Sequence, residues 1–133
     1  MLDAHRLVPD NAELNFALGN YWLEKKDIPK TKQFYRRALE LNPRHSGVFN
    51  NLGIIALDEK RPDLAKKFLE NSLQFDPGDA KTFYLLAKAK LALGDNAGAK
   101  QDIQEALRLR PGTREFAALR DELSRIEQPS PTP

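Results

Sequence analysis

The side chains that could do chemistry in this chain are two histidines and scattered carboxylates, and there is no cysteine. Without cysteine the chain has no thiol nucleophile, no disulfide and no thiolate metal ligand. Neither His5 nor His45 is followed by a histidine or carboxylate three or four residues later. That spacing is what brings two metal ligands to one face of a helix. We therefore expect each histidine to lie in a turn or on the surface, and we expect no metal site.

Motifs that hold phosphate or activate a serine are absent from the sequence. It contains neither a glycine-rich phosphate loop nor a nucleophile elbow. Carboxylate pairs such as Asp121-Glu122 stand among arginines. This is expected of a solvated helix surface and not of a pair that exchanges protons with a substrate. The sequence thus predicts a chain that is not an enzyme and needs no cofactor.

The overall charge is nearly balanced, with 21 basic and 19 acidic residues among 133. This balance argues against a nucleic-acid partner, which usually requires a strongly basic surface. No apolar run approaches the roughly 20 residues of a membrane-spanning helix. The first residues, MLDAHRLVPD, do not resemble a signal peptide. We expect no membrane span, and these features favour a soluble, cytoplasmic protein.

One local cluster of positive charge stands out against this balance. Its members are Lys25, Lys26, Lys30, Lys32, Arg36 and Arg37, with Asp27 as the single acid among them. The simpler interpretation is the solvated outer face of a helix. The alternative is a contact for an acidic partner or for membrane headgroups. The chain as a whole lacks the overall basicity expected of a nucleic-acid surface.

A repeat with a period of about 34 residues is the main feature of the sequence. Pro9, Pro43, Pro77 and Pro111 follow one another at this constant interval. Small and large apolar residues keep the same step: Gly19, Gly53 and Ala87; Thr31, Ala65 and Ala99; Tyr35, Leu69 and Ile103; Ala38, Ser72 and Ala106. Within each repeat, apolar residues recur every three or four positions. This predicts helices over 12–25, 29–42, 46–59, 62–75, 80–93 and 96–110.

The period and its two helical halves resemble the tetratricopeptide repeat (TPR) family. The resemblance implies an all-α fold, a right-handed α-solenoid of antiparallel helix pairs, that binds other proteins. It implies three repeats, at 10–43, 44–77 and 78–111. Residues 1–9 resemble the end of a helix from a preceding repeat, which would mean more repeats upstream.

The end of the sequence departs from the repeat in a way typical of a terminal cap. Residues 112–127 predict a C-terminal capping helix, with Thr113 as its N-cap and one apolar stripe: Phe116, Leu119, Leu123 and Ile126. Residues 128–133 are rich in proline, and we expect them to be disordered.

Three positions depart from the family pattern. Asn15 stands where an aromatic residue is usual, and Ala56 and Lys90 stand where the first repeat has Trp22. We expect these positions to pack less well than their counterparts.

In TPR arrays the first helices of successive repeats line a concave groove, and the resemblance assigns the groove positions by register. The contact residues it implies are Phe16, Asn20, Asn50, Asn51, Ile54, Lys81, Tyr84 and Lys88. Aromatic and aliphatic side chains would supply affinity, and amides and lysines would orient a peptide backbone. The predicted partner is therefore an extended peptide or a short helix.

Other interpretations stay open at this point. One TPR subgroup clamps the C-terminal carboxylate of chaperone tails. Asn20, Asn51 and Lys81 match three of its positions, but Phe16 and Leu85 stand where the clamp needs a lysine and an arginine. The chain could instead be the substrate-recruiting arm of a larger enzyme, or a scaffold that self-associates through an exposed repeat edge.

Overall fold

The computed structural model describes residues 10–127, which form seven helices and no strand. In chain order the helices are α1 (Ala12–Glu24), α2 (Ile28–Leu41), α3 (Ser46–Asp58), α4 (Pro62–Phe75), α5 (Ala80–Ala92), α6 (Asn96–Leu109) and α7 (Arg114–Glu127). Each of the first six begins and ends within one residue of its predicted bounds. The predicted helix remnant at 1–9, with His5, and the predicted tail at 128–133 lie outside the described residues.

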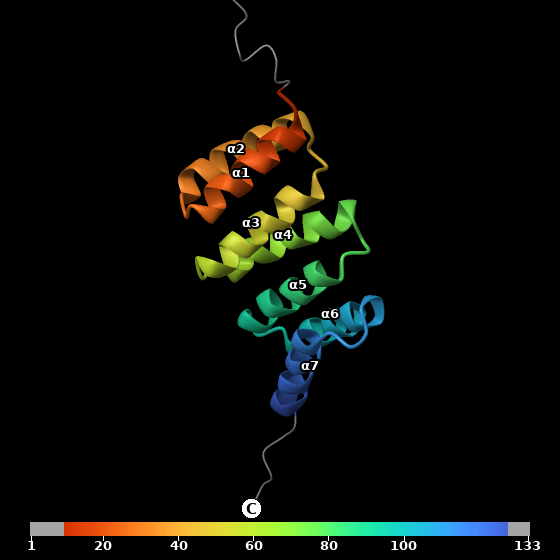
Figure 1. Ribbon diagram of the computed structural model, residues 1–133. Helices are drawn as coiled ribbons and strands as arrows, with labels where there is room; N and C mark the ends of the chain where they lie inside the picture. Colours follow the sequence, from red (N-terminus) through yellow and green to blue (C-terminus); the bar gives the residue numbers. More distant parts are fainter. Residues whose placement is uncertain (1–9, 128–133) are drawn as a thin grey trace, which may run out of the picture. The chain divides into compact units, whose positions relative to one another are not determined.

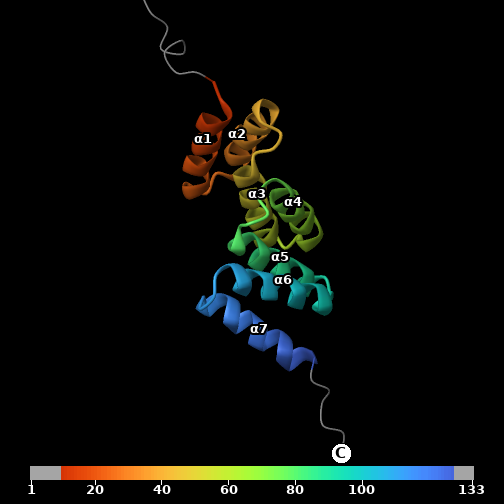
Figure 2. The same ribbon diagram turned by 90° about the vertical axis from the view of Figure 1, so that its right-hand side faces the viewer.

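The described chain divides into two compact units, with the boundary between Val48 and Phe49. The first unit contains the α1–α2 pair and the first residues of α3 (Figure 1). The second contains the rest of α3 and the helices α4 to α7. Within it, α5 packs against both α4 and α6, and α6 packs against α7 (Figure 2).

Aspartates begin several of these helices. The Oδ1 atoms of Asp27, Asp79 and Asp95 accept hydrogen bonds from the first-turn N–H groups of α2, α5 and α6, at 3.1, 3.1 and 2.9 Å. Such bonds satisfy backbone donors that have no partner inside the helix. Thr113 directly precedes α7, but its hydroxyl donates to the Arg110 carbonyl oxygen at 3.0 Å.

The core residues are those that recur at the repeat interval. Thr31, Ala65 and Ala99 are fully buried, and so are Tyr35, Leu69 and Ile103. Glycine permits the closest approach of the two helices of a pair. A Cβ atom on Gly19 would lie 2.3 Å from the Tyr35 ring, and one on Gly53 would lie 2.6 Å from Leu69. The repeating small residues therefore let the helices of each pair pack together.

The second unit has two apolar clusters, one on each side of α5. One contains residues of α3, α4 and α5: Ala56, Ala65, Leu69, Leu85, Leu86 and Ala89. The other contains residues of α5, α6 and α7: Ala80, Ala87, Ala99, Ile103, Ala106, Phe116, Leu119 and Leu123. Three of the four residues of the predicted α7 stripe belong to this second cluster. α7 thus covers the apolar face that the third repeat would otherwise expose.

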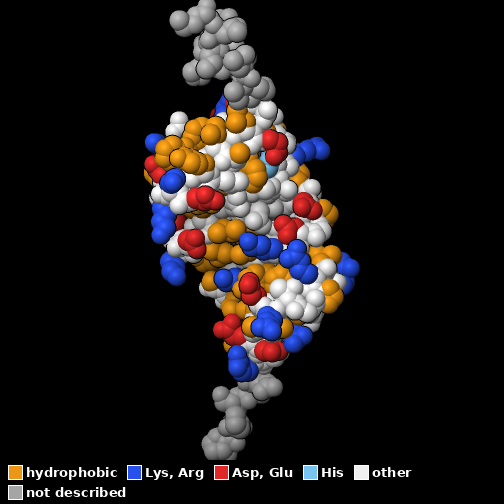
Figure 3. All heavy atoms as spheres, in the orientation of Figure 1, with side chains coloured by type: hydrophobic (Ala, Val, Ile, Leu, Met, Phe, Trp, Pro, Cys, Tyr) orange, Lys and Arg blue, Asp and Glu red, His pale blue; other side chains and the backbone are white. Residues whose placement is uncertain are grey.

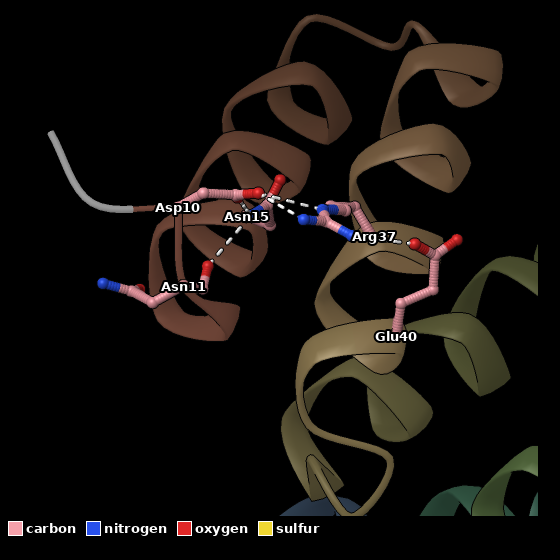
Figure 4. A network of polar contacts seen from close by, with 5 residues as sticks. All are labelled: Asp10, Asn11, Asn15, Arg37 and Glu40. Carbon is pink, nitrogen blue, oxygen red and sulfur yellow. Dashed lines mark hydrogen bonds and ion pairs between the residues drawn. The ribbon is translucent and has the colours of Figure 1, made fainter. Parts of the chain in front are cut away.

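Asn15, which stands where an aromatic residue was expected, belongs to a network of polar side chains (Figure 4). Its side chain is only 5% exposed, and its Nδ2 donates to Asp10 Oδ1 at 2.6 Å and to the Asn11 carbonyl at 2.9 Å. Asp10 also accepts from Arg37 Nε and Nη2, at 3.0 and 2.6 Å, and Arg37 Nη1 donates to Glu40 at 3.0 Å. Hydrogen bonds from Arg37 and then from Asn15 lower the pKa of the Asp10 carboxyl.

The other two departures also differ from the expectation of poor packing. Ala56 is buried in the cluster of α3, α4 and α5. Lys90 forms an ion pair with Asp102, with 2.8 Å between Nζ and Oδ2, and both side chains are largely buried. Burial raises the pKa of the Asp102 carboxyl, and Lys90 opposes this shift. The third repeat therefore has a buried charge pair on α5 and α6.

Candidate functional site

Two of the predicted contact residues, Phe16 and Asn20, belong to α1 in the first unit. The Phe16 ring lies 4.6 Å from the His45 ring and 5.9 Å from the Tyr35 ring, measured between centroids. Asn20 Oδ1 accepts a hydrogen bond from the Tyr35 hydroxyl. Both residues are partly buried, so each has a packing role in addition to any role in binding.

His45 was expected to lie in a turn or on the surface. It lies in the turn between α2 and α3, and it is not on the surface. It precedes α3, but it is only 8% exposed. Its Nδ1 accepts from the Val48 N–H at 3.2 Å, and its Nε2 lies 2.6 Å from Glu13 Oε1. Because Nδ1 accepts, Nε2 carries the proton and donates to the carboxylate. Within the first unit, His45 thus links Val48, in the first turn of α3, to Glu13 on α1.

The predicted contact residues of α3 lie in the second unit and are half-buried. Asn50 Nδ2 donates to the hydroxyl of the fully buried Thr82 on α5, at 2.5 Å. Ile54 packs against the cluster of α3, α4 and α5. Asn51 is partly exposed, whereas Leu85, one repeat later in the same register, is only 7% exposed and belongs to that cluster.

α5 contributes the remaining three predicted residues. Lys81 and Lys88 are exposed, and Tyr84 is partly buried. Tyr84 contacts both apolar clusters, and its ring lies 5.1 Å from that of Phe116 on α7. The Lys88 ammonium lies 5.5 Å from the centre of the Tyr84 ring. An aromatic ring attracts a cation at this distance.

Two hollows lie beside Lys88 in the second unit. The α3–α5 hollow has a volume of about 470 Å³ and is lined by Leu57, Asp58, Lys60, Pro62, Lys88 and Ala92. The α5–α7 hollow has a volume of about 430 Å³ and is lined by Tyr84, Lys88, Glu115, Ala118, Leu119, Glu122 and Arg125. Both volumes fall within the usual range of ligand sites, roughly 300–1,000 Å³. Lys88 lines both hollows.

The contact residues predicted from the sequence do not include those that α7 contributes. One more step of the repeat interval would have found them, because Lys81 leads to Glu115, Tyr84 to Ala118, Leu85 to Leu119 and Lys88 to Glu122. All four of these α7 residues line the α5–α7 hollow. Figure 3 shows basic side chains over α5 and a mixture of acidic and basic ones over α7. α7 is therefore both a cap and one wall of this hollow.

Several residues of the basic cluster have partners within the first unit. The Lys30 ammonium lies 4.0 Å from the Trp22 ring centre, and the Lys25 ammonium lies 5.6 Å from that of Tyr21. Arg37 pairs with Asp10 and Glu40. Both rings belong to α1, which precedes the basic cluster in the sequence. The sequence alone did not predict these contacts between lysines and rings.

Within residues 10–127, no group of three or more histidine, cysteine, aspartate or glutamate side chains gathers where it could hold a metal ion. None of the helices in that range combines the length and the apolar composition needed to cross a membrane.

Comparison with known families identifies the repeat. A profile of the tetratricopeptide repeat family matches residues 56–123, just over half of the chain. The chain belongs to the tetratricopeptide repeat family. The seven helices correspond to three TPRs and a C-terminal capping helix, as the sequence predicted.

Solved TPR structures share the fold. The first TPR of Spaghetti (RPAP3), bound to the HSP90 peptide SRMEEVD, superposes with a TM-score of 0.81 at 17% identity. The match covers 86% of this chain and 91% of that one. The predicted all-α TPR solenoid is thereby confirmed.

Relatives of known function are much longer proteins. Serine/threonine-protein phosphatase 5 of Rattus norvegicus is 24% identical over 108 residues, which is 81% of this chain and 22% of the relative. BBSome complex member BBS4 of Xenopus tropicalis is 31% identical over 102 residues, 77% of this chain and 20% of the relative. The TPR chain thus spans about a fifth of the length of these curated relatives.

Proposed function

We propose that this TPR chain is a non-catalytic adaptor or scaffold that binds a peptide or short helix of another protein along its first helices. The observation that carries the proposal is the arrangement around α5. Lys81 and Lys88 are exposed there, and hollows lie on both sides of Lys88. Each hollow combines apolar and charged side chains: three of the six lining residues of the α3–α5 hollow and four of the seven of the α5–α7 hollow are charged.

The RPAP3 domain supports peptide binding as the general activity, since its structure contains an HSP90 peptide. It does not support the same ligand here. A clamp for a chaperone tail would need cations where this chain has Phe16 and Leu85. Phe16 instead packs against His45, and Leu85 is buried. Because hydrogen bonds to charged groups contribute about 1.5–3 kcal/mol each, losing two cations would greatly weaken such a clamp.

The test is affinity capture with the full chain and a charge-swapped variant. Phe16 and Tyr84 are poor targets, since their rings pack against neighbouring side chains. The exposed pair Lys88→Glu/Glu122→Lys keeps the net charge and inverts the charge pattern of the α5–α7 hollow. We expect partners captured by the wild type to be lost or strongly reduced.

The matched control is the swap Asp63→Lys/Lys67→Glu on α4, which also keeps the net charge and lies outside both hollows. It should capture the same partners as the wild type, and circular dichroism should show that both variants are folded. Identical partner sets for all three proteins would refute binding at these helices.

A second candidate function is the substrate-recruiting arm of a larger enzyme. The observation favouring it is the match to phosphatase 5, of which this chain spans 22%. In that case the same surface would bind the enzyme's substrates. A catalytic domain in the complete gene, whose activity on captured partners falls with Lys88→Glu/Glu122→Lys, would support this function. Unchanged activity would exclude it.

Self-association is a further possibility that the sequence left open, through an exposed repeat edge. It predicts a molecular mass that rises with protein concentration in light scattering. A constant monomer mass across the range would exclude it.

A further inference from the structure

We propose that the α5–α7 hollow receives a basic side chain, arginine or lysine, of the bound partner. The inference rests on the proposed function and specifies the chemistry of its ligand. It distinguishes this chain from the RPAP3 domain, whose bound peptide SRMEEVD contains a run of acidic residues.

The floor of the hollow suits the stem of a long side chain. Tyr84, Ala118 and Leu119 provide apolar surface there. Arginine and lysine bury their methylene groups on such a surface while the charged end reaches a polar partner. The Tyr84 ring adds a face on which a guanidinium can stack.

Two carboxylates stand where the charged end would lie. Glu115 and Glu122 are seven residues apart on α7, which places them two turns apart on one side of the helix. Both line the hollow. Among residues 10–127, neither has an ion pair with another side chain. Carboxylates without an ion-pair partner can accept charge-assisted hydrogen bonds from a guanidinium, and such bonds are stronger than hydrogen bonds between neutral groups.

One cation of the chain itself, the Lys88 ammonium, already lies at this site. Its ammonium lies over the Tyr84 ring, at 5.5 Å, beside the hollow that contains the two glutamates. Lys88 also lines the α3–α5 hollow, which contains Asp58. An arriving cation could therefore replace Lys88 over the ring, while Lys88 turns toward the other hollow. Arg125 is the second native cation at the site.

The potential at the Tyr84 hydroxyl agrees with a site for cations. Burial raises the pKa of Tyr84, and the charges of Glu115 and Glu122 raise it further. Both carboxylates are thus close enough to act on the ring, and their field makes a nearby negative charge less favourable.

The experiment titrates the isotope-labelled full chain with Nα-acetyl-arginine amide and follows backbone amide shifts by NMR. We expect saturable shifts centred on Tyr84, Ala118 and Leu119. Nα-acetyl-citrulline amide, which is neutral and of similar shape, should bind about tenfold more weakly or worse. Nα-acetyl-glutamate amide should bind no better than citrulline. Equal binding of the arginine and citrulline probes, or tighter binding of the glutamate probe, would overturn the proposal.

Variants give a second, signed readout. Glu115→Gln/Glu122→Gln should lower the affinity for the arginine probe about tenfold, and Lys88→Gln should raise it, because a competing cation is removed. Asp121→Asn is the control, since it removes a negative charge from the same helix outside the hollow. It should change little. Loss of binding in Lys88→Gln, or an equal effect of Asp121→Asn, would contradict the site.

The two proposals can fail separately. If the arginine probe does not bind but the charge-swapped variant loses its partners, only the ligand chemistry proposed here is wrong. If the probe binds and all capture results are identical, the adaptor function is wrong although the cation site exists.

Discussion

The Tyr35 ring lies so close to Gly19 that a Cβ atom on the glycine would be 2.3 Å from the ring Cε1 atom. Tyr35 is fully buried and donates to Asn20, so the ring has little freedom to move. Gly19→Ala should therefore destabilise the chain by about 1–3 kcal/mol through overpacking. This exceeds the roughly 0.5–1 kcal/mol that alanine gains over glycine inside a helix. Urea denaturation measures the change.

The other repeats supply the controls for this prediction. Gly53→Ala should cost less, because its nearest neighbour is the aliphatic side chain of Leu69. The third repeat already pairs Ala87 with Ile103. Adding Gly19→Ala to a Tyr35→Ile variant should therefore cost less than adding it to the wild type. An equal cost in both backgrounds would show that the ring is not the obstacle.

This contact illustrates what the sequence could predict. The constant repeat interval located the small and large residues between the two helices of each pair, and Thr31, Ala65 and Ala99 are all fully buried. The helix bounds followed from apolar spacing and from prolines in the first turns of α2 and α4. These features depend on local sequence and on one packing rule that is repeated along the chain.

The features that could not be predicted depend on contacts between distant residues. Asn15 was expected to pack poorly, but it joins Asp10 and Arg37 in a network, and Arg37 lies on another helix. The departure at Lys90 is likewise explained only by its partner Asp102. For the candidate site, sequence register supplied the α5 residues. It missed the α7 wall because the last helix was treated as a cap alone.

The Lys90–Asp102 pair gives a second prediction. Taking two charges out of water costs free energy that their attraction often only balances, so apolar replacements of similar size are frequently neutral or better. Lys90→Met/Asp102→Leu should leave the chain equally stable or stabilise it by about 1–4 kcal/mol. The melting temperature and urea denaturation would report this.

Single substitutions at the same pair should behave differently. Asp102→Leu alone leaves Lys90 as a largely buried charge without its partner. This variant should lower the free energy of unfolding by up to about 5 kcal/mol. If the single variant were as stable as the double, the ion pair would have no structural role.

The pKa of Asp102 predicts how stability depends on pH. Because burial raises this pKa, the folded chain holds the proton more tightly than the unfolded chain, whose value is near 3.8. The contribution of Asp102 to the free energy of unfolding should fall as pH rises from about 3.8 through the pKa of the folded state. Above that pKa the contribution should stay constant. Asp102→Asn cannot titrate, so the wild type should lose stability relative to this variant over that window.

Asp10 should show the opposite sign and serves as the contrast. Arg37 lowers its pKa, so its contribution should be present above about 3.8 and lost as pH falls through the folded value. Urea denaturation from pH 2 to 7, comparing the wild type with Asp10→Asn, measures this. The same trend with pH in both comparisons would contradict one of the two assignments.

The turn inside each repeat gives the last prediction. Lys26, Lys60 and Gly94 occupy the same position in successive repeats and have φ values of 62°, 60° and 84°. This left-handed conformation costs an ordinary side chain roughly 1–2 kcal/mol and glycine almost nothing. Lys60→Gly should therefore stabilise the chain by up to about 1 kcal/mol, whereas Lys60→Ala, which removes the charge but keeps Cβ, should not. Conversely, Gly94→Ala should destabilise it, although a Cβ atom there would meet no neighbour within 4 Å. A gain with alanine equal to that with glycine would show that charge, and not backbone conformation, sets the cost at this turn.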